Sequence, residues 1–124
     1  MRVLQVPVKT VGAPGGAVGV GTTGLPWGRL VALAIDWAGA APGTSDITVT
    51  AVLPVGAAKV LYAKDNSVAD VPLIQPRVLA QDDAGDDIAD VYVEPVVGGL
   101  LQVDVVGCDA LDPAVTVVVV IDVD

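Results

Sequence analysis

Carboxylates are the most abundant side chains in this chain that could do chemistry, and their densest cluster lies between Gln81 and Asp90. Carboxylates gathered on one loop can chelate calcium, which takes about six to eight oxygen ligands. The run QDDAGDDIAD does not follow the EF-hand pattern, because Gly85 stands fourth when counted from Asp82 and no glutamate follows within the loop. We therefore expect a solvated hairpin tip with no metal or other cofactor, and a calcium site is the alternative.

A second pattern with chemical meaning is GVGTTG at residues 19–24, which matches the phosphate-binding turn G-x-G-x-x-G. A helix begins at the end of such a turn, yet residues 24–28 read GLPWG, with two glycines and a proline that oppose a helix. The crossover unit that accompanies a dinucleotide-binding turn is also missing from the sequence that follows. The pattern predicts a glycine-rich connection and no nucleotide site.

Residue sets for catalysis are missing from the sequence. It contains no His, so Cys108 has no imidazole to activate it, and no G-x-S-x-G turn surrounds Ser45 or Ser67. Zinc would need Cys and His ligands that the chain does not supply. Carboxylate pairs can hydrolyse glycosides, but two Trp and two Tyr are few aromatic residues for a sugar-binding cleft. We predict that the protein is not an enzyme.

The elements that would carry these residues are strands, because apolar and polar residues alternate with period two along most of the chain. We expect strands at Arg2 to Thr10, Ala17 to Thr22, Arg29 to Trp37, Asp46 to Leu53, Ala58 to Ala63, Val71 to Ala80, Ile88 to Val93, Gly99 to Val106 and Ala114 to Val123. Eight or nine short strands at this spacing predict an all-β, single-domain β-sandwich over residues 1–124, jelly-roll-like in preference to immunoglobulin-like. The segment Gly12 to Gly28 holds seven of the 14 glycines, and we expect a mobile arm or a loosely paired edge strand there.

The last strand differs from the others because both of its faces are apolar. Alternation directs Val117, Val119 and Ile121 into the core, which leaves Val118 and Val120 on the opposite face. Either a neighbouring subunit covers this pair or the Gly12 to Gly28 segment folds over it.

The two tryptophans lie in different settings. Trp37 ends a strand of core periodicity, which favours a place in the core or at its rim. Trp27, between Pro26 and Gly28, is a candidate interface anchor. The predicted interface residues are therefore Trp27, Val118 and Val120.

Charge and composition limit the partners. The net charge of −9, from 15 acidic and 6 basic residues, repels phosphate backbones, so we expect no binding to DNA or RNA. No run reaches the roughly 18 apolar residues of a membrane span, and the first residues lack the apolar core of a signal peptide. With one cysteine there is no internal disulfide. We expect synthesis in a reducing cytoplasm, no membrane partner, and a basic partner surface or a solvated acidic exterior.

Several short patterns, taken in order, resemble those of small proteins encoded among the head and structural genes of tailed bacteriophages. They are GRLVALAIDW from Gly28, TSDITVT from Thr44, QPR from Gln75, DAG from Asp83, EP from Glu94, GLLQVDV from Gly99 and the valine-rich last strand. The resemblance covers about the last three-quarters of the chain.

The resemblance implies a virion structural protein, and the role we expect is a decoration or cement subunit that binds the major capsid lattice and stabilises the head. Its partners would be the major capsid protein or another virion protein, together with copies of itself, and its location would be the virion. The alternative is a binding module of a tail or fibre that recognises a host surface or a carbohydrate.

Overall fold

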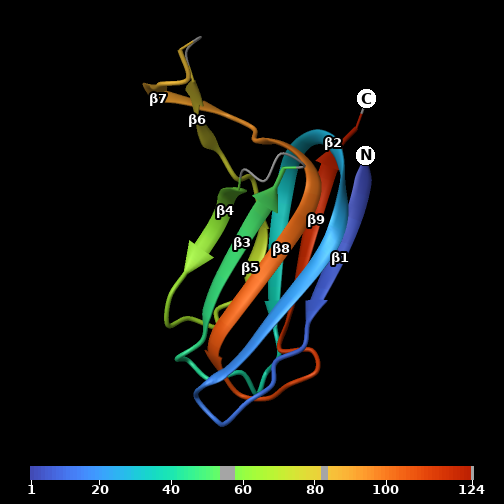
Figure 1. Cartoon of the computed structure of the whole chain (residues 1–124), viewed down its shortest axis with the longest axis vertical. Coiled ribbons are helices and arrows are strands. Elements are labelled where there is room, and N and C mark those ends of the chain that lie inside the picture. The colour runs from blue at the N-terminus through green and yellow to red at the C-terminus, as the bar shows by residue number, and fades with distance from the viewer. Residues whose placement is uncertain (54–57, 82–83, 124) are drawn as a thin grey trace.

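The computed structural model describes residues 1–53, 58–81 and 84–123, with the backbone alone at 79–81. Within these ranges the chain forms nine strands and no helix (Figure 1). The strands are β1 (Arg2–Val8), β2 (Ala17–Trp37), β3 (Asp46–Val52), β4 (Ala58–Lys64), β5 (Val71–Ile74), β6 (Val78–Gln81), β7 (Asp87–Val93), β8 (Val96–Cys108) and β9 (Val115–Asp122). No helix in the described part of the chain is long and apolar enough to cross a membrane.

The strands form two layers that share β2, whose 21 residues run through both. From Ala17 to Arg29 this strand pairs with β8, with a register shift between Leu25 and Gly28, and from Arg29 to Trp37 it pairs with β9. The first layer therefore has the order first half of β2, β8, β3, β4, and the second has the order β1, β9, second half of β2, β5. All of these pairs are antiparallel.

This order is that of a jelly roll. With the halves of β2 counted as two strands and the β6–β7 hairpin set aside, the first strand pairs with the last, the second with the seventh, the third with the sixth and the fourth with the fifth. The pattern is one long hairpin folded over on itself into two sheets. The predicted all-β sandwich with jelly-roll topology is confirmed.

The core lies between the layers and follows from the alternation of the sequence. In β9 the burial alternates strictly, so that Val117, Val119 and Ile121 are fully buried, as predicted. From the other layer β3 contributes Ile47 and Val49, again as every second residue. Further core side chains are Val6, Val8, Leu30, Leu33, Ile35, Trp37, Val97, Leu101, Val103 and Val105.

The glycine-rich segment agrees with the prediction in part. Residues 17–28 form the first half of β2 at the edge of its layer, so the edge-strand alternative holds and the mobile arm does not, but this strand continues into Arg29 to Trp37 and is not separate from it. The glycines permit a close approach: a Cβ at Gly19 would lie under 3.0 Å from the carbonyl oxygen of Lys9, and one at Gly21 would lie 2.9 Å from that of Pro7. The end of β1 therefore packs directly on β2, which closes this side of the sandwich.

A second difference concerns Val71 to Ala80, which was predicted as one strand. It divides into β5 and β6 around Pro76, which is buried and has no N–H to donate to a ladder. Strand β5 pairs with β2 in the sandwich, whereas β6 pairs with β7 in a separate hairpin. That hairpin projects from the upper end of the sandwich, the end that also carries both termini (Figure 1).

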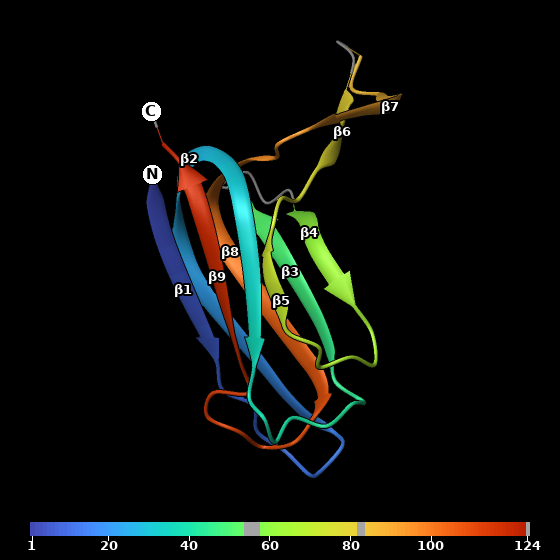
Figure 2. The same cartoon turned by 180° about the vertical axis from the view of Figure 1, so that it is seen from behind.

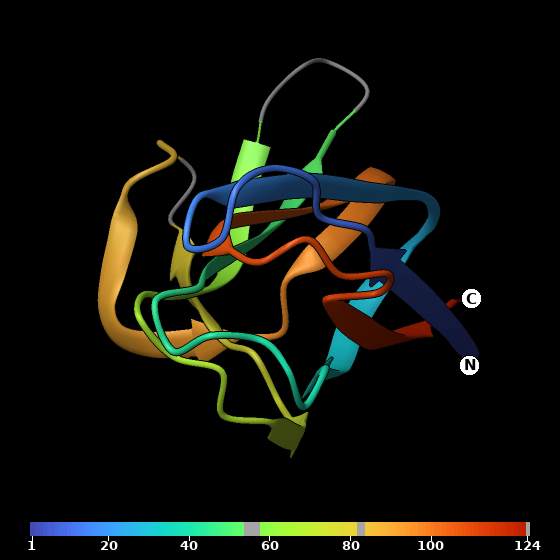
Figure 3. The same cartoon turned by 90° about the horizontal axis from the view of Figure 1, so that it is seen from below.

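Three connections, at residues 9–16, 38–45 and 109–114, close the lower end (Figure 3). The buried Thr10 joins two of them, since its Oγ1 donates a hydrogen bond to the carbonyl of Asp109 at 2.6 Å and accepts one from the N–H of Leu111 at 3.0 Å. The Asp109 carboxylate accepts a bond from the N–H of Gly15 at 2.9 Å. The upper end carries two of the features described next.

Candidate functional site: an uncovered sheet face and an upper-end cleft

The outer face of the second layer is apolar at its centre. On β9, Val118 and Val120 point outward and are half-buried, as the alternation predicts. In the register, Val120 lies opposite Val3 of β1 and Ala32 of β2, while Val118 lies opposite Gln5 and Ala34. We call Val3, Ala34, Val118 and Val120 the apolar outer face; Val3 is 63% exposed.

No described segment of the chain covers this face. Figure 2 looks onto the second layer, and β9 and the second half of β2 lie open to the viewer. The Gly12 to Gly28 segment is placed elsewhere, because residues 17–25 pair with β8 in the opposite layer and residues 12–16 lie at the lower end. The proposed intramolecular cover for Val118 and Val120 is therefore wrong.

The corresponding face of the first layer has a polar centre. Thr22, Gln102 and Thr50 lie side by side on β2, β8 and β3. The Gln102 side chain donates a hydrogen bond to the Asp104 carboxylate at 3.0 Å. Exposed valines on this face are Val18, Val20 and Val60 on its edge strands and Val106 near the lower end of β8. The two outer faces thus differ in chemistry, and only the second layer presents an apolar centre.

Trp27 lies at the bend between the two halves of β2, at the upper end of the sandwich. Its side chain is 61% exposed, but a backbone contact fixes the position of the ring. An ideal Cβ built at the buried Gly98 would overlap three atoms of the indole, so the ring rests directly on the Gly98 backbone. Only glycine at 98 leaves room for this contact.

A cleft of about 420 Å³ opens beside this ring and is lined by Trp27, Gly28, Arg29, Val96 and Asp122. Within it, Arg29 Nη2 lies 3.3 Å from Asp122 Oδ2 in an ion pair whose side chains are 56% and 36% exposed. Asp122 also continues the outward row of Val118 and Val120 along β9. The cleft and the apolar outer face therefore meet at the upper end of this strand.

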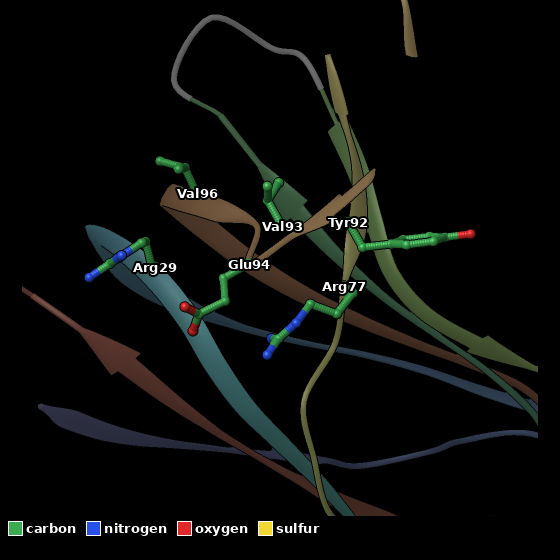
Figure 4. Close-up of a pocket in the computed structure, with 6 residues that line it drawn as sticks. All are labelled: Arg29, Arg77, Tyr92, Val93, Glu94 and Val96. Atoms are coloured by element: carbon green, nitrogen blue, oxygen red, sulfur yellow. The ribbon is translucent and has the colours of Figure 1, made fainter. Parts of the chain in front are cut away.

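A second cleft, of about 550 Å³, shares Arg29 and Val96 with the first and extends to the base of the β6–β7 hairpin. Arg77, Tyr92, Val93 and Glu94 complete its lining. Figure 4 shows the Glu94 carboxylate between the side chains of Arg29 and Arg77, whereas the Tyr92 ring points away from all three. Arg77 also donates a hydrogen bond to the Gln75 side chain at 3.1 Å.

The described part of the acidic run, residues 84–90, lies in the β6–β7 hairpin. Residues 84–90 are exposed, while Asp82 and Asp83 lie outside the described residues. Among the residues that the structure describes, no group of three or more His, Cys, Asp or Glu side chains is arranged to hold a metal ion. Cys108 is fully buried at the end of β8.

Sequence reasoning predicted Trp27, Val118 and Val120 as interface residues, and it did not identify the charged residues of the two clefts. Arg29, Arg77, Glu94 and Asp122 come from four separate segments, and only the bend of β2 and the base of the hairpin bring them to one end. The one signal in the sequence was that Arg29 and Arg77 are two of only six basic residues.

Comparison with protein-family models finds none that matches the chain, and comparisons with curated proteins and with solved structures find no match.

Proposed function

We propose that the chain is a structural subunit that works by assembly, as a decoration or cement subunit of a tailed-bacteriophage head. The observation that carries the proposal is the apolar outer face, where Val118 and Val120 are covered by no described part of the chain. A contiguous apolar patch on a soluble domain marks an interaction surface, because its burial against a partner is favourable by about 25 cal/mol per Å². The partner would be the major capsid lattice or a neighbouring copy.

Two further observations agree with this role. The short patterns from Gly28 to the last strand resemble those of phage head and structural proteins. Jelly rolls recur in viral capsid proteins and in lectins, and this fold-level analogy raises the prior for a virion protein without assigning a function. The subunit would be made in the host cytoplasm and reside in the particle.

The test is a double substitution, Val118→Asp/Val120→Asp. The matched control is Thr48→Asp/Thr50→Asp, because these residues occupy equivalent outward, half-buried positions on a central strand of the opposite layer. We expect the valine variant to keep its melting curve but to lose multimer formation or binding to particles, while the control keeps both. If the aspartates lower the stability of the protein, the milder variant Val118→Ser/Val120→Ser replaces them in the same assembly test. A folded valine variant that still assembles as the wild type does would refute the proposal.

A second candidate is a binding module of a tail or fibre that recognises a host surface. The upper-end cleft with Trp27 favours it, since an exposed, fixed aromatic ring beside charged groups is suited to ligand binding. Cryo-electron microscopy of purified particles separates the two. A decoration subunit occurs in many copies over the head lattice, whereas a tail or fibre module occurs in few copies at one end.

A further inference from the structure

The ring of Trp27 is a preformed stacking platform. One of its faces rests on Gly98, and the side chain is nevertheless 61% exposed, so the opposite face is open to solvent. Because the contact with Gly98 already fixes the ring, a ligand that stacks on it loses little side-chain entropy. An exposed tryptophan held in this way is ready to bind an apolar surface of a ligand.

Hydrogen-bonding groups lie next to this platform. Arg29 carries five N–H donors in a fixed plane, and its ion pair with Asp122 leaves both groups partly exposed to the cleft. Arg77 and Glu94 add a second cation and a second carboxylate in the adjoining cleft. The two clefts, of about 420 and 550 Å³, have the size of small-ligand sites, which span about 300–1,000 Å³.

The charges of the lining indicate what kind of ligand fits. Two arginines face two carboxylates, so the lining has no net charge and offers both donors and acceptors. An anionic ligand would approach Glu94 and Asp122 on a chain whose net charge is already −9. A neutral ligand with many hydroxyl groups could use the arginines and the carboxylates at once, without leaving either charge unpaired.

We propose that the joined clefts bind a neutral saccharide. A C–H face of a sugar ring would stack on Trp27, while the ring hydroxyls would donate to Asp122 and Glu94 and accept from Arg29 and Arg77. The site goes beyond the assembly role, because it lies at the upper end and does not need the apolar outer face. It fits a subunit on the head as well as one on a tail.

The wild-type protein should be tested on an array of neutral oligosaccharides that also carries sialylated and sulfated ones, followed by calorimetric titration with the sugars that bind. We expect binding to at least one neutral oligosaccharide. Trp27→Ala should weaken it at least about tenfold, and Gly98→Ala should weaken it as well, because its methyl group displaces the ring. Val60→Ala is the control: it removes an exposed apolar side chain of β4 that lines neither cleft, and it should leave affinity within about twofold.

Four results would overturn the saccharide site. The first two are that the protein binds no neutral sugar on the array, or that it binds the acidic sugars alone. The third is that Trp27→Ala keeps the full affinity. The fourth is that the protein binds no sugar and that Trp27→Ala loses assembly. The last would assign Trp27 to a protein interface. The Val118→Asp/Val120→Asp variant should keep its sugar affinity, so failure of the assembly proposal and failure of this one are distinguishable.

Discussion

Replacing Gly19 by alanine should destabilise the protein, even though the substitution adds one methyl group to a strand. A Cβ at this position would lie under 3.0 Å from the carbonyl oxygen of Lys9, a backbone atom that cannot turn aside as a flexible side chain can. Backbone hydrogen bonds hold this stretch on both sides. The N–H of Ala114 donates to the carbonyl of Val8 at 2.8 Å, and the N–H of Thr10 donates to that of Leu111 at 3.0 Å.

The size of the effect follows from these contacts. To admit the methyl group, the end of β1 must move away from β2, which weakens both hydrogen bonds and opens packing around Val8. Each hydrogen bond contributes about 1 kcal/mol, and overpacking of a core costs about 1–3 kcal/mol. We therefore expect a loss of about 2–4 kcal/mol in the free energy of unfolding. For a domain of this size that lowers the Tm by roughly 6–20 °C.

Thermal and urea denaturation followed by circular dichroism measure this loss. Gly24→Ala is the control, because Gly24 lies on the same half of β2 and a Cβ there meets nothing within 4 Å. That variant should match the wild type or gain about 0.4–1 kcal/mol from lower entropy of the unfolded chain. If Gly19→Ala melted together with Gly24→Ala, the close approach of β1 to β2 would not be the reason for glycine at 19.

Two further predictions concern the core and the hairpin. Trp37→Ala should cost about 3–5 kcal/mol by denaturant titration, because this side chain is only 7% exposed in the core, whereas Trp27→Ala should cost no more than about 1 kcal/mol; equal losses would contradict the placement of the two rings. Calcium should leave the Tm unchanged, because the described part of the hairpin has no clustered ligands. A ligand at 100 times its Kd adds about 2.7 kcal/mol, so a rise of several degrees that disappears in Asp82→Ala/Asp86→Ala would indicate a metal site.

The strands with regular alternation could be predicted from sequence, because which side chains of a strand enter the core depends on that strand's own pattern. In β3 and β9 the period-two alternation placed Ile47, Val49 and Val119 in the core, and all three are buried there. The same alternation placed Val118 and Val120 outward. Whether anything covers them depends on the rest of the fold, which alternation along one strand does not describe.

The glycine-rich half of β2 could not be predicted as part of a long strand, for a physical reason. Glycine is unfavourable in strands, and the advantage of Gly19 and Gly21 appears only once β1 has packed against them. The clefts present the same difficulty, since Arg29 and Arg77 are 48 positions apart in the numbering and meet through tertiary structure alone. Within Val71 to Ala80, the sequence shows Pro76 as a residue that interrupts a strand. It does not show that the segments before and after Pro76 pair with different strands.

The β6–β7 hairpin makes the charge of the protein separable from its fold. Val78 and Val93 are paired across its base, so a short link could replace everything between them without stretching the sandwich. Five of the 15 carboxylates lie between Val78 and Val93, with no Lys or Arg among them, so their removal would bring the net charge from −9 to −4. Natural variation or engineering of the hairpin could therefore change the solubility of the protein and its long-range attraction to charged partners. The packing of the jelly roll would not change with it.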